Sequence, residues 1–211
     1  RANDLAMPSV FEMGREFGKP QVRGSSTSVF EAVLEGTFTS LKLAAAALIL
    51  GTLIGVGAAI LMARFKVVQR GLMPYLVISQ TIPLIALAPL TVTWGGEISI
   101  FGFEWQKWTS ALVLGAFLSF FPIAVGALRG FNSPDPAAVE LMDSYAASWW
   151  STWRKLRLPA AIPYLAPAMR LAGSAAVFGV VVSELSVGLT NGVGYLILAY
   201  LQEGTSRPAK V

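Results

Sequence analysis

Residues that could do chemistry are few in this chain. The sequence contains no histidine and no cysteine, the residues that most often serve as general bases, nucleophiles and metal ligands. An acidic residue, Glu184, lies deep in an apolar stretch of the sequence. An unpaired carboxylate inside a membrane costs about 2.5 kcal/mol or more, so Glu184 needs a partner or a function. We therefore expect no catalytic residue and no metal site on this chain.

Two pairs of polar residues within apolar stretches are candidates for a solute pathway. Gln80 and Thr81 precede Pro83, and a kinked polar stretch inside a membrane usually faces protein or a cavity. Ser183 and Glu184 lie near the end of the last long apolar stretch. Two interpretations of Glu184 stay open. It either faces a central cavity as a pathway or gating residue, or it is a helix-end group that reaches external water or pairs with Lys107.

The composition indicates the elements that must position these residues. Hydrophobic residues make up 55% of the chain and charged residues 13%, whereas soluble domains are roughly 45–50% apolar and about 25% charged. A membrane-crossing helix needs about 20 residues. The stretches that are long enough are 41–63, 72–94, 109–128 and 166–189. We therefore predict an all-α membrane protein, a polytopic helical bundle.

Small residues and prolines predict details of the first two spans. Gly51 and Gly55 have the spacing that lets two helices pack closely. Three prolines in the second span, Pro74, Pro83 and Pro89, predict a kinked helix that neighbouring helices tolerate.

Clusters of basic residues predict the orientation. They follow the first and third spans, at Arg64, Lys66, Arg70, Arg129, Arg154, Lys155 and Arg157. By the positive-inside rule these loops are cytoplasmic, and the aromatic loop 95–108 is external. The net charge of +4 therefore indicates topology and not nucleic-acid binding, because the cations do not gather on one polar face.

The ends of the chain complete the predicted organisation. Residues 1–36 are expected to form an external or interfacial amphipathic segment, and residues 37–211 the transmembrane domain. The apolar segment 192–201 is too short to span and is expected on the external side. Since no closing span follows it, we expect a further helix beyond Val211.

The loop 132–159 is too long and too patterned for a simple connection. Asp135 and Pro136 suit the start of a helix over 137–145, and Ser148 suits the start of a second helix over 149–158 that ends before Pro159. The loop is therefore predicted to be a helical hairpin at the cytoplasmic face. Composition alone would equally allow an amphipathic hairpin whose tryptophans lie among lipid headgroups.

The spacing within this hairpin resembles the signature loop of the permease subunits of ABC importers. Glu140 stands at the glutamate position, Leu156 at the aliphatic position, and Leu158-Pro159 at the closing Leu-Pro. Other stretches resemble the nitrate, sulfonate and taurine branch of these permeases. They are Pro83 to Leu90, Phe120-Phe121-Pro122, Pro159 to Leu165 and Gly192 to Ile197.

The hairpin departs from the family pattern at two places. Leu141-Met142 replace two alanines, and Ala146 replaces the usual glycine. Because a left-handed alanine is strained by roughly 1 kcal/mol or more, we expect a turn without positive φ at Ala146.

The resemblance implies a type I ABC importer permease fold in a bacterial inner membrane. It also implies the partners: cytoplasmic ATPase subunits that hold ATP and Mg, a second permease copy, an external solute-binding protein and membrane lipid. This chain itself would carry no cofactor. Residues 137–158 would dock on the ATPase as a coupling hairpin. The residues expected there are Glu140, Asp143, Ala146, Trp149, Trp150, Trp153, Leu158 and Pro159.

Three alternatives concern function and substrate. An ATP-independent channel or secondary transporter would commonly carry paired intramembrane charges or inverted repeats, and we find no convincing internal repeat. An intramembrane enzyme is disfavoured by the missing histidine and cysteine. The resemblance leaves nitrate, sulfonates and vitamin- or pyrimidine-like heterocycles open as substrates. The scarcity of cations in the spans favours weakly charged heterocycles.

Overall fold

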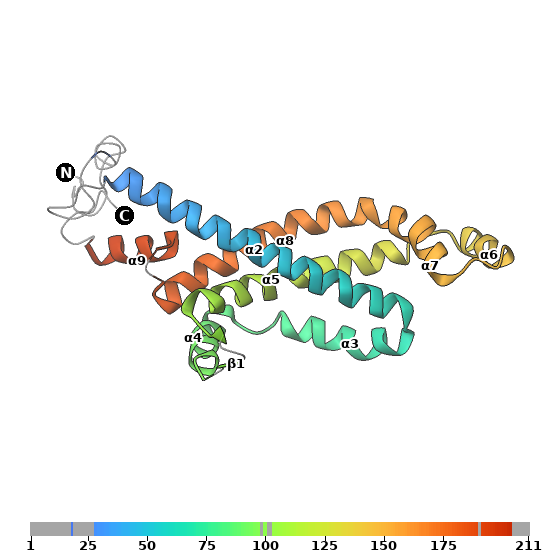
Figure 1. Ribbon diagram of the computed structural model, residues 1–211, viewed down its shortest axis with the longest axis horizontal. Helices are drawn as coiled ribbons and strands as arrows, with labels where there is room; N and C mark the ends of the chain where they lie inside the picture. The colour runs from blue at the N-terminus through green and yellow to red at the C-terminus, as the bar shows by residue number, and fades with distance from the viewer. Residues whose placement is uncertain (1–17, 19–27, 98, 101–102, 190, 204–211) are drawn as a thin grey trace, which may run out of the picture.

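The computed structural model describes residue 18 and residues 28–97, 99–100, 103–189 and 191–203 (Figure 1). Most of the predicted N-terminal segment lies outside these residues. The first long helix, α2 (Val29–Arg64), begins inside that segment. Ser28 caps it in a reciprocal arrangement, since its hydroxyl accepts from the Glu31 N–H and its own N–H donates to the Glu31 carboxylate. Residues 29–36 are therefore the first turns of α2.

The second predicted span is broken. Helix α3 (Lys66–Ser79) and helix α4 (Leu84–Gly95) meet at an angle of 103°. The break coincides with Gln80 and Thr81, and Pro83 precedes the first residue of α4. The predicted kink is thus a sharp bend, after which α4 packs across α5 and α8 (Figure 1).

The remaining long helices lie beside α2. Strands β1 (Ser99–Ile100) and β2 (Phe103–Glu104) pair antiparallel and lead into α5 (Lys107–Phe131). Helix α8 (Leu158–Val187) follows the hairpin, and the short α9 (Val193–Glu203) follows α8. Among the described residues, three helices are long and apolar enough to span a membrane, or four if the bent pair counts as one.

The hairpin consists of α6 (Pro136–Ser144), α7 (Trp149–Thr152) and a π-helical turn, η1 (Trp153–Arg157). The prediction that its second helix ends before Pro159 is wrong, because η1 runs directly into α8. Pro159 lies at the second position of α8, directly after the wider π turn.

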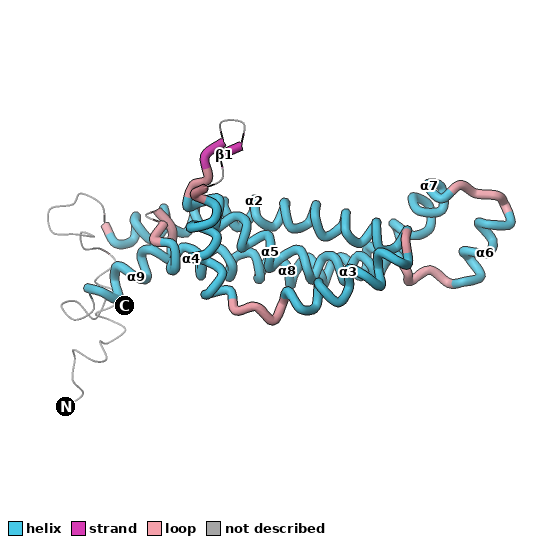
Figure 2. Tube along the Cα trace, turned by 90° about the horizontal axis from the view of Figure 1, so that it is seen from below, coloured by secondary structure: helices cyan, strands magenta, loops and turns pink. Residues whose placement is uncertain are grey.

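The two ends of the bundle agree with the predicted orientation. The α2–α3 connection and the α6–α7 hairpin lie at one end, and α9 and β1 lie at the other (Figures 1 and 2). The basic loops therefore share one end of the bundle, and the aromatic loop lies at the opposite end.

Glycines allow close contact between α5 and its two neighbours. A Cβ on Gly55 of α2 would lie 2.7 Å from the Phe120 carbonyl oxygen of α5. On the other side, Gly179 of α8 lies against Gly115 of α5, where an added Cβ would be 2.9 Å from the Gly115 Cα. Gly51 and Gly55 therefore serve helix packing, the general role that their spacing predicts.

A buried carboxylate joins three helices at the end of the bundle that carries α9. Glu184 of α8 is fully buried, and the Ser40 hydroxyl of α2 lies 2.7 and 2.8 Å from its two oxygens. The Gly194 N–H donates to the same carboxylate at 2.9 Å, and the Val193 N–H donates to the Ser40 oxygen at 2.9 Å. The carboxylate thus satisfies one N–H group at the start of α9 directly, where negative charge is also favoured by the helix dipole, and the Ser40 hydroxyl satisfies a second.

Neither partner foreseen for Glu184 is present. The carboxylate does not reach water, and no ion pair with Lys107 occurs among the described residues. Two glycines make the contact possible, because a side chain on Gly192 or Gly194 would collide with Glu184. Gly192 and Gly194 are therefore required by the position of α9.

We predict that Gly55→Ala destabilises the bundle. The added methyl would meet the α5 backbone, and such overpacking costs about 1–3 kcal/mol. Unfolding in detergent, followed by circular dichroism, measures the loss. Gly57→Ala is the control, since a Cβ there meets nothing within 4 Å. Equal stability of the two variants would contradict the packing role of Gly55.

We also predict that Glu184→Ala loosens α9. The buried Ser40 hydroxyl and the Gly194 N–H would lose their acceptor, at a cost of about 1–3 kcal/mol for each unsatisfied group. Hydrogen exchange of the α9 amides should become faster, whereas Glu184→Gln keeps an acceptor oxygen and should lose less protection.

Ser186→Ala is the control for this measurement. Ser186 is exposed on the same helix, and its hydroxyl donates to the Val182 carbonyl within that helix. Unchanged exchange of α9 in the Glu184→Ala protein would show that the carboxylate does not hold it.

Candidate functional site

The hairpin turn is closed by backbone hydrogen bonds. The Ala146 N–H donates to the Asp143 carbonyl at 2.9 Å, and the Ala147 N–H donates to the Met142 carbonyl at 3.0 Å. These two bonds define a Schellman motif at the end of α6, which needs a left-handed residue after the cap. Ala146 occupies that position with φ of +48°, so the expectation of a turn without positive φ is wrong. The bonds to two otherwise free carbonyls offset the strain.

The tip of the hairpin is fully open to its surroundings. Asp135 caps α6 by accepting from the Ala137 N–H at 2.9 Å, and none of the described residues of α6 is buried. Glu140, Asp143 and Ala146 are all exposed. Two large apolar side chains accompany them, Leu141 at 57% and Tyr145 at 78% exposure. Sequence reasoning did not select these two as contact residues, although apolar residues in a polar, capped helix are the available signal.

The three tryptophans lie at the base of the hairpin and form one stack. The Trp150 and Trp153 rings lie 5.2 Å apart with an interplanar angle of 13°, and Trp149 lies 6.3 Å from Trp153. Phe131 of α5 contacts Trp153, and the Arg64 guanidinium of α2 lies over Trp149. The stack therefore joins the hairpin to two spans. Trp150, at 58% exposure, presents the most open surface of the three.

Polar contacts fix the same joint. The Arg157 guanidinium donates to the Phe131 carbonyl at 3.1 Å, and the Ser133 hydroxyl donates to the Gly130 carbonyl at 2.8 Å. Leu158 packs against the core cluster that contains Phe131, whereas Pro159 is exposed. The hairpin therefore leaves the bundle as a braced extension of α5 and α8.

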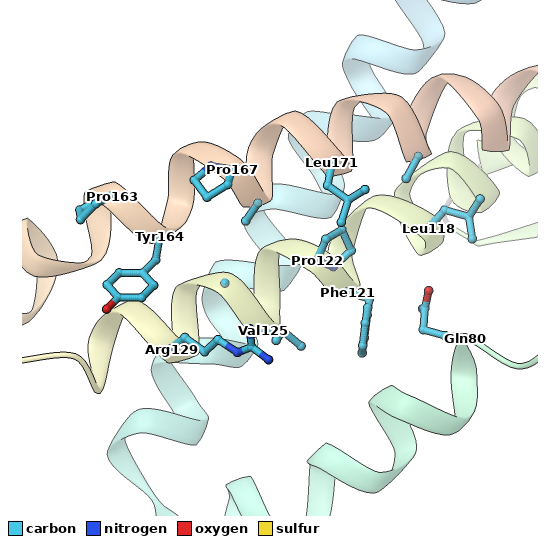
Figure 3. A pocket seen from close by; sticks show the side chains of 13 residues that line it. Gln80, Leu118, Phe121, Pro122, Val125, Arg129, Pro163, Tyr164, Pro167 and Leu171 are labelled. Atoms are coloured by element: carbon cyan, nitrogen blue, oxygen red, sulfur yellow. The ribbon is translucent and has the colours of Figure 1, made fainter.

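A cavity of about 600 Å³ lies between α5, α8 and the break after α3 (Figure 3). Pro163, Pro167 and Leu171 follow one another at intervals of four along α8, so they form one face of this helix. The side chains that line the cavity are mostly apolar. They are Gln80, Leu118, Phe121, Pro122, Val125, Arg129, Tyr164, Ala168 and Ala175 together with those three and the backbone of Gly126.

The predicted pathway residues are not brought together. Gln80 lines the cavity, whereas Thr81 is exposed and donates to the Ile78 carbonyl. Ser183 is buried and donates to the Gly179 carbonyl at 2.6 Å, and Glu184 is bound to α2 and α9 as described above. Arg129, which the sequence assigned to a cytoplasmic loop, belongs to α5 and lines the cavity. Within the described part of the chain, no cluster of three or more acidic side chains is placed to hold a metal ion.

Comparison with known proteins gives the family. Residues 51–204 match the family described as "Binding-protein-dependent transport system inner membrane component". The chain is 34% identical over 86% of its length to a "Probable ABC transporter permease protein" of Haemophilus influenzae, of which it covers 71%. It is 33% identical over 81% of its length to the "Formylaminopyrimidine transport permease protein ThiX" of Halalkalibacterium halodurans. It is 32% identical over 75% to the "Putative aliphatic sulfonates transport permease protein SsuC" of Bacillus subtilis.

These matches cover 63% of the ThiX protein and 54% of the SsuC protein, so the chain spans less than two thirds of either. A solved structure entitled "Crystal structure of an amino acid ABC transporter with histidines" shares the fold, with a TM-score of 0.66 and 20% identity over 86% of this chain and 83% of that one. The chain therefore belongs to the inner membrane components of binding-protein-dependent transport systems, as an all-α, polytopic permease subunit of the ABC transporter type.

Proposed function

We propose that this chain is the permease subunit of an ATP-driven importer in a bacterial inner membrane, and that it moves a small solute delivered by an external binding protein. The observation that carries the proposal is the braced hairpin with an exposed tip, at the opposite end of the bundle from α9 (Figure 1). Family membership favours this function over an ATP-independent channel or a secondary transporter.

The tip of the hairpin is the proposed contact with the ATPase. Leu141 and Tyr145 supply apolar anchors, and Glu140 and Asp143 supply charges at the rim. A few large side chains usually dominate such an interface, and aromatic residues are prominent among them. ATP and Mg would be bound by the ATPase, so this chain supplies docking and movement rather than bond chemistry.

The tryptophan stack then transmits movement of the tip. Trp149 and Trp153 contact α2 and α5 through Arg64 and Phe131, so they act at the joint, while Trp150 remains available for the partner. Because packed helices move as rigid bodies, a displaced hairpin would tilt α5 and α8 together. Those helices form two walls of the cavity.

A second permease copy is proposed to complete the pore. The spans carry many exposed apolar side chains, among them Ile49, Leu53 and Phe178, which lipid or another copy would cover. Two of the relatives are named as transport permeases for formylaminopyrimidine and for aliphatic sulfonates. We propose a small organic solute of this size range for this chain.

We predict that Tyr145→Ala reduces binding of the ATPase subunit. Loss of a central aromatic anchor costs about 2 kcal/mol or more, which is roughly a thirty-fold weaker complex. Glu140→Lys should act in the same direction and abolish uptake without affecting insertion. Copurification of a tagged permease with the ATPase, and ATP-dependent uptake in vesicles, measure both effects.

Tyr75→Ala is the control for that experiment. Tyr75 is a similarly exposed tyrosine, at 71%, but it belongs to α3. Purification of the wild-type chain without any ATPase, or normal uptake by a correctly inserted Glu140→Lys protein, would refute the coupling role.

We predict further that Ala146→Gly stabilises the hairpin turn and that Ala146→Val disrupts it. Glycine relieves a strain of roughly 1 kcal/mol at positive φ, whereas a β-branched residue is rarely found there. Hydrogen exchange of the Ala147 amide reports the change, and uptake should fall only with valine. Ala147→Gly, one residue later, lacks the positive φ and should give no gain.

A further inference from the structure

The polar groups of the cavity are separated along its length. Arg129 and Tyr164 lie at one end, and Gln80 lies at the other, with Phe121 and Pro122 between them (Figure 3). No aspartate or glutamate is among the described residues that line it. The cavity therefore offers one positive charge and no negative charge to a solute.

Arg129 has no partner within the described part of the protein. Its guanidinium makes no hydrogen bond and no ion pair there, whereas Arg157 donates to the Phe131 carbonyl nearby. A guanidinium carries five N–H donors in a planar fork that fits the oxygens of an acid. Figure 3 shows the Arg129 side chain extending along the cavity toward Val125, whereas the Tyr164 hydroxyl points away from that guanidinium.

A simpler role for Arg129 is that of a topology signal at the cytoplasmic end of α5. That role needs only a cation near the membrane surface, which Arg154 and Lys155 also provide from η1. It does not account for the position of Arg129 in the cavity lining beside Tyr164. Arg129 is exposed and lines the cavity, so its guanidinium is open to a solute there as well.

The walls favour a flat, apolar body. Phe121 and Tyr164 contribute aromatic rings, and Pro122, Pro163 and Pro167 contribute rigid rings without N–H donors. The volume of about 600 Å³ lies within the range of pockets that enclose small molecules, about 300–1,000 Å³. Aromatic solutes can stack against such walls.

We propose that this cavity binds a small aromatic or heteroaromatic anion, whose sulfonate or carboxylate group lies against Arg129 and whose ring lies against Phe121, Tyr164 and the prolines. Gln80 then contacts polar groups at the far end of the solute. This inference rests on the proposed transport function. It adds a negative charge to the weakly charged heterocycle that the sequence favours as substrate. Sequence reasoning missed the charge because it counted Arg129 as part of a loop.

Binding of probe compounds to the complete permease tests the proposal. Benzenesulfonate, its neutral analogue benzenesulfonamide, methanesulfonate and benzylamine would be titrated onto the protein, assembled with its ATPase in nanodiscs, by isothermal calorimetry. We expect benzenesulfonate to bind roughly ten- to hundred-fold more tightly than benzenesulfonamide, the range that one charge-assisted contact supplies. Methanesulfonate should bind weakly because it lacks the ring, and benzylamine should not bind.

Variants identify the residue responsible. Arg129→Gln should remove the preference for benzenesulfonate over benzenesulfonamide, and Arg129→Lys should keep part of it. Arg154→Gln, which removes an exposed cation outside the cavity lining, should bind as the wild type does. An unchanged preference in Arg129→Gln, or no binding of benzenesulfonate at millimolar concentration, overturns the proposal.

An anionic lipid headgroup presents the same chemistry to Arg129. Nanodiscs of phosphatidylcholine alone and nanodiscs with added phosphatidylglycerol separate the two sources. A solute site keeps its preference in both lipids, and loss of the preference with phosphatidylglycerol assigns Arg129 to lipid and overturns the proposal. Copurification of the ATPase tests the transport function separately, so either idea can fail alone.

Discussion

Close backbone contact between α5 and its neighbours is the constraint on which the bundle depends. In lipid, burial of apolar side chains drives helices together only weakly, so packing and hydrogen bonds must hold them. Gly55 of α2 and Gly179 of α8 each lie against the α5 backbone, and Gly130 of α5 lies against Ala161 of α8 near the hairpin. These contacts run along the bundle from the end near α9 to the end near the hairpin. They make α2, α5 and α8 one closely packed unit, on which the bent pair α3 and α4 packs through larger side chains such as Leu76 and Leu84.

That division gives the hairpin mechanical access to the cavity. Helix α8 begins at η1 and carries Pro163 and Pro167 within its first three turns, so the hairpin base and one cavity wall belong to the same element. Phe131 of α5 contacts Trp153 and accepts from Arg157, which attaches the second wall to the same joint. Gln80, at the end of α3, belongs to the bent pair formed by α3 and α4. A tilt of α5 and α8 would therefore change the distance between Arg129 and Gln80, the polar residues at opposite ends of the cavity.

Local patterns in the sequence were enough to predict the long apolar helices and the starts of the two short helices of the hairpin. Hydropathy, basic clusters and N-caps such as Asp135 act within a few residues, so each can be recognised without the fold. Contacts between distant residues could not be predicted in this way. Ser40 and Glu184 are 144 positions apart, and the tryptophan stack needs Arg64 and Phe131 from two other helices. The prediction of the backbone conformation at Ala146 was wrong for a related reason. It considered the strain of a positive φ without the two backbone hydrogen bonds that this conformation permits.

The contrast between Glu184 and Arg129 shows why a charge in an apolar stretch is ambiguous from sequence alone. Glu184 seemed to require a function because an unpaired carboxylate is costly, yet Ser40 and the start of α9 supply its partners. Arg129 seemed ordinary because it was counted with a cytoplasmic loop, yet it belongs to α5, and its exposed guanidinium has no partner among the described residues and lines a cavity. In a membrane bundle, a buried polar group whose hydrogen bonds are all made within the protein stabilises the fold. A polar group that faces a cavity without such bonds is the one left free to bind a solute.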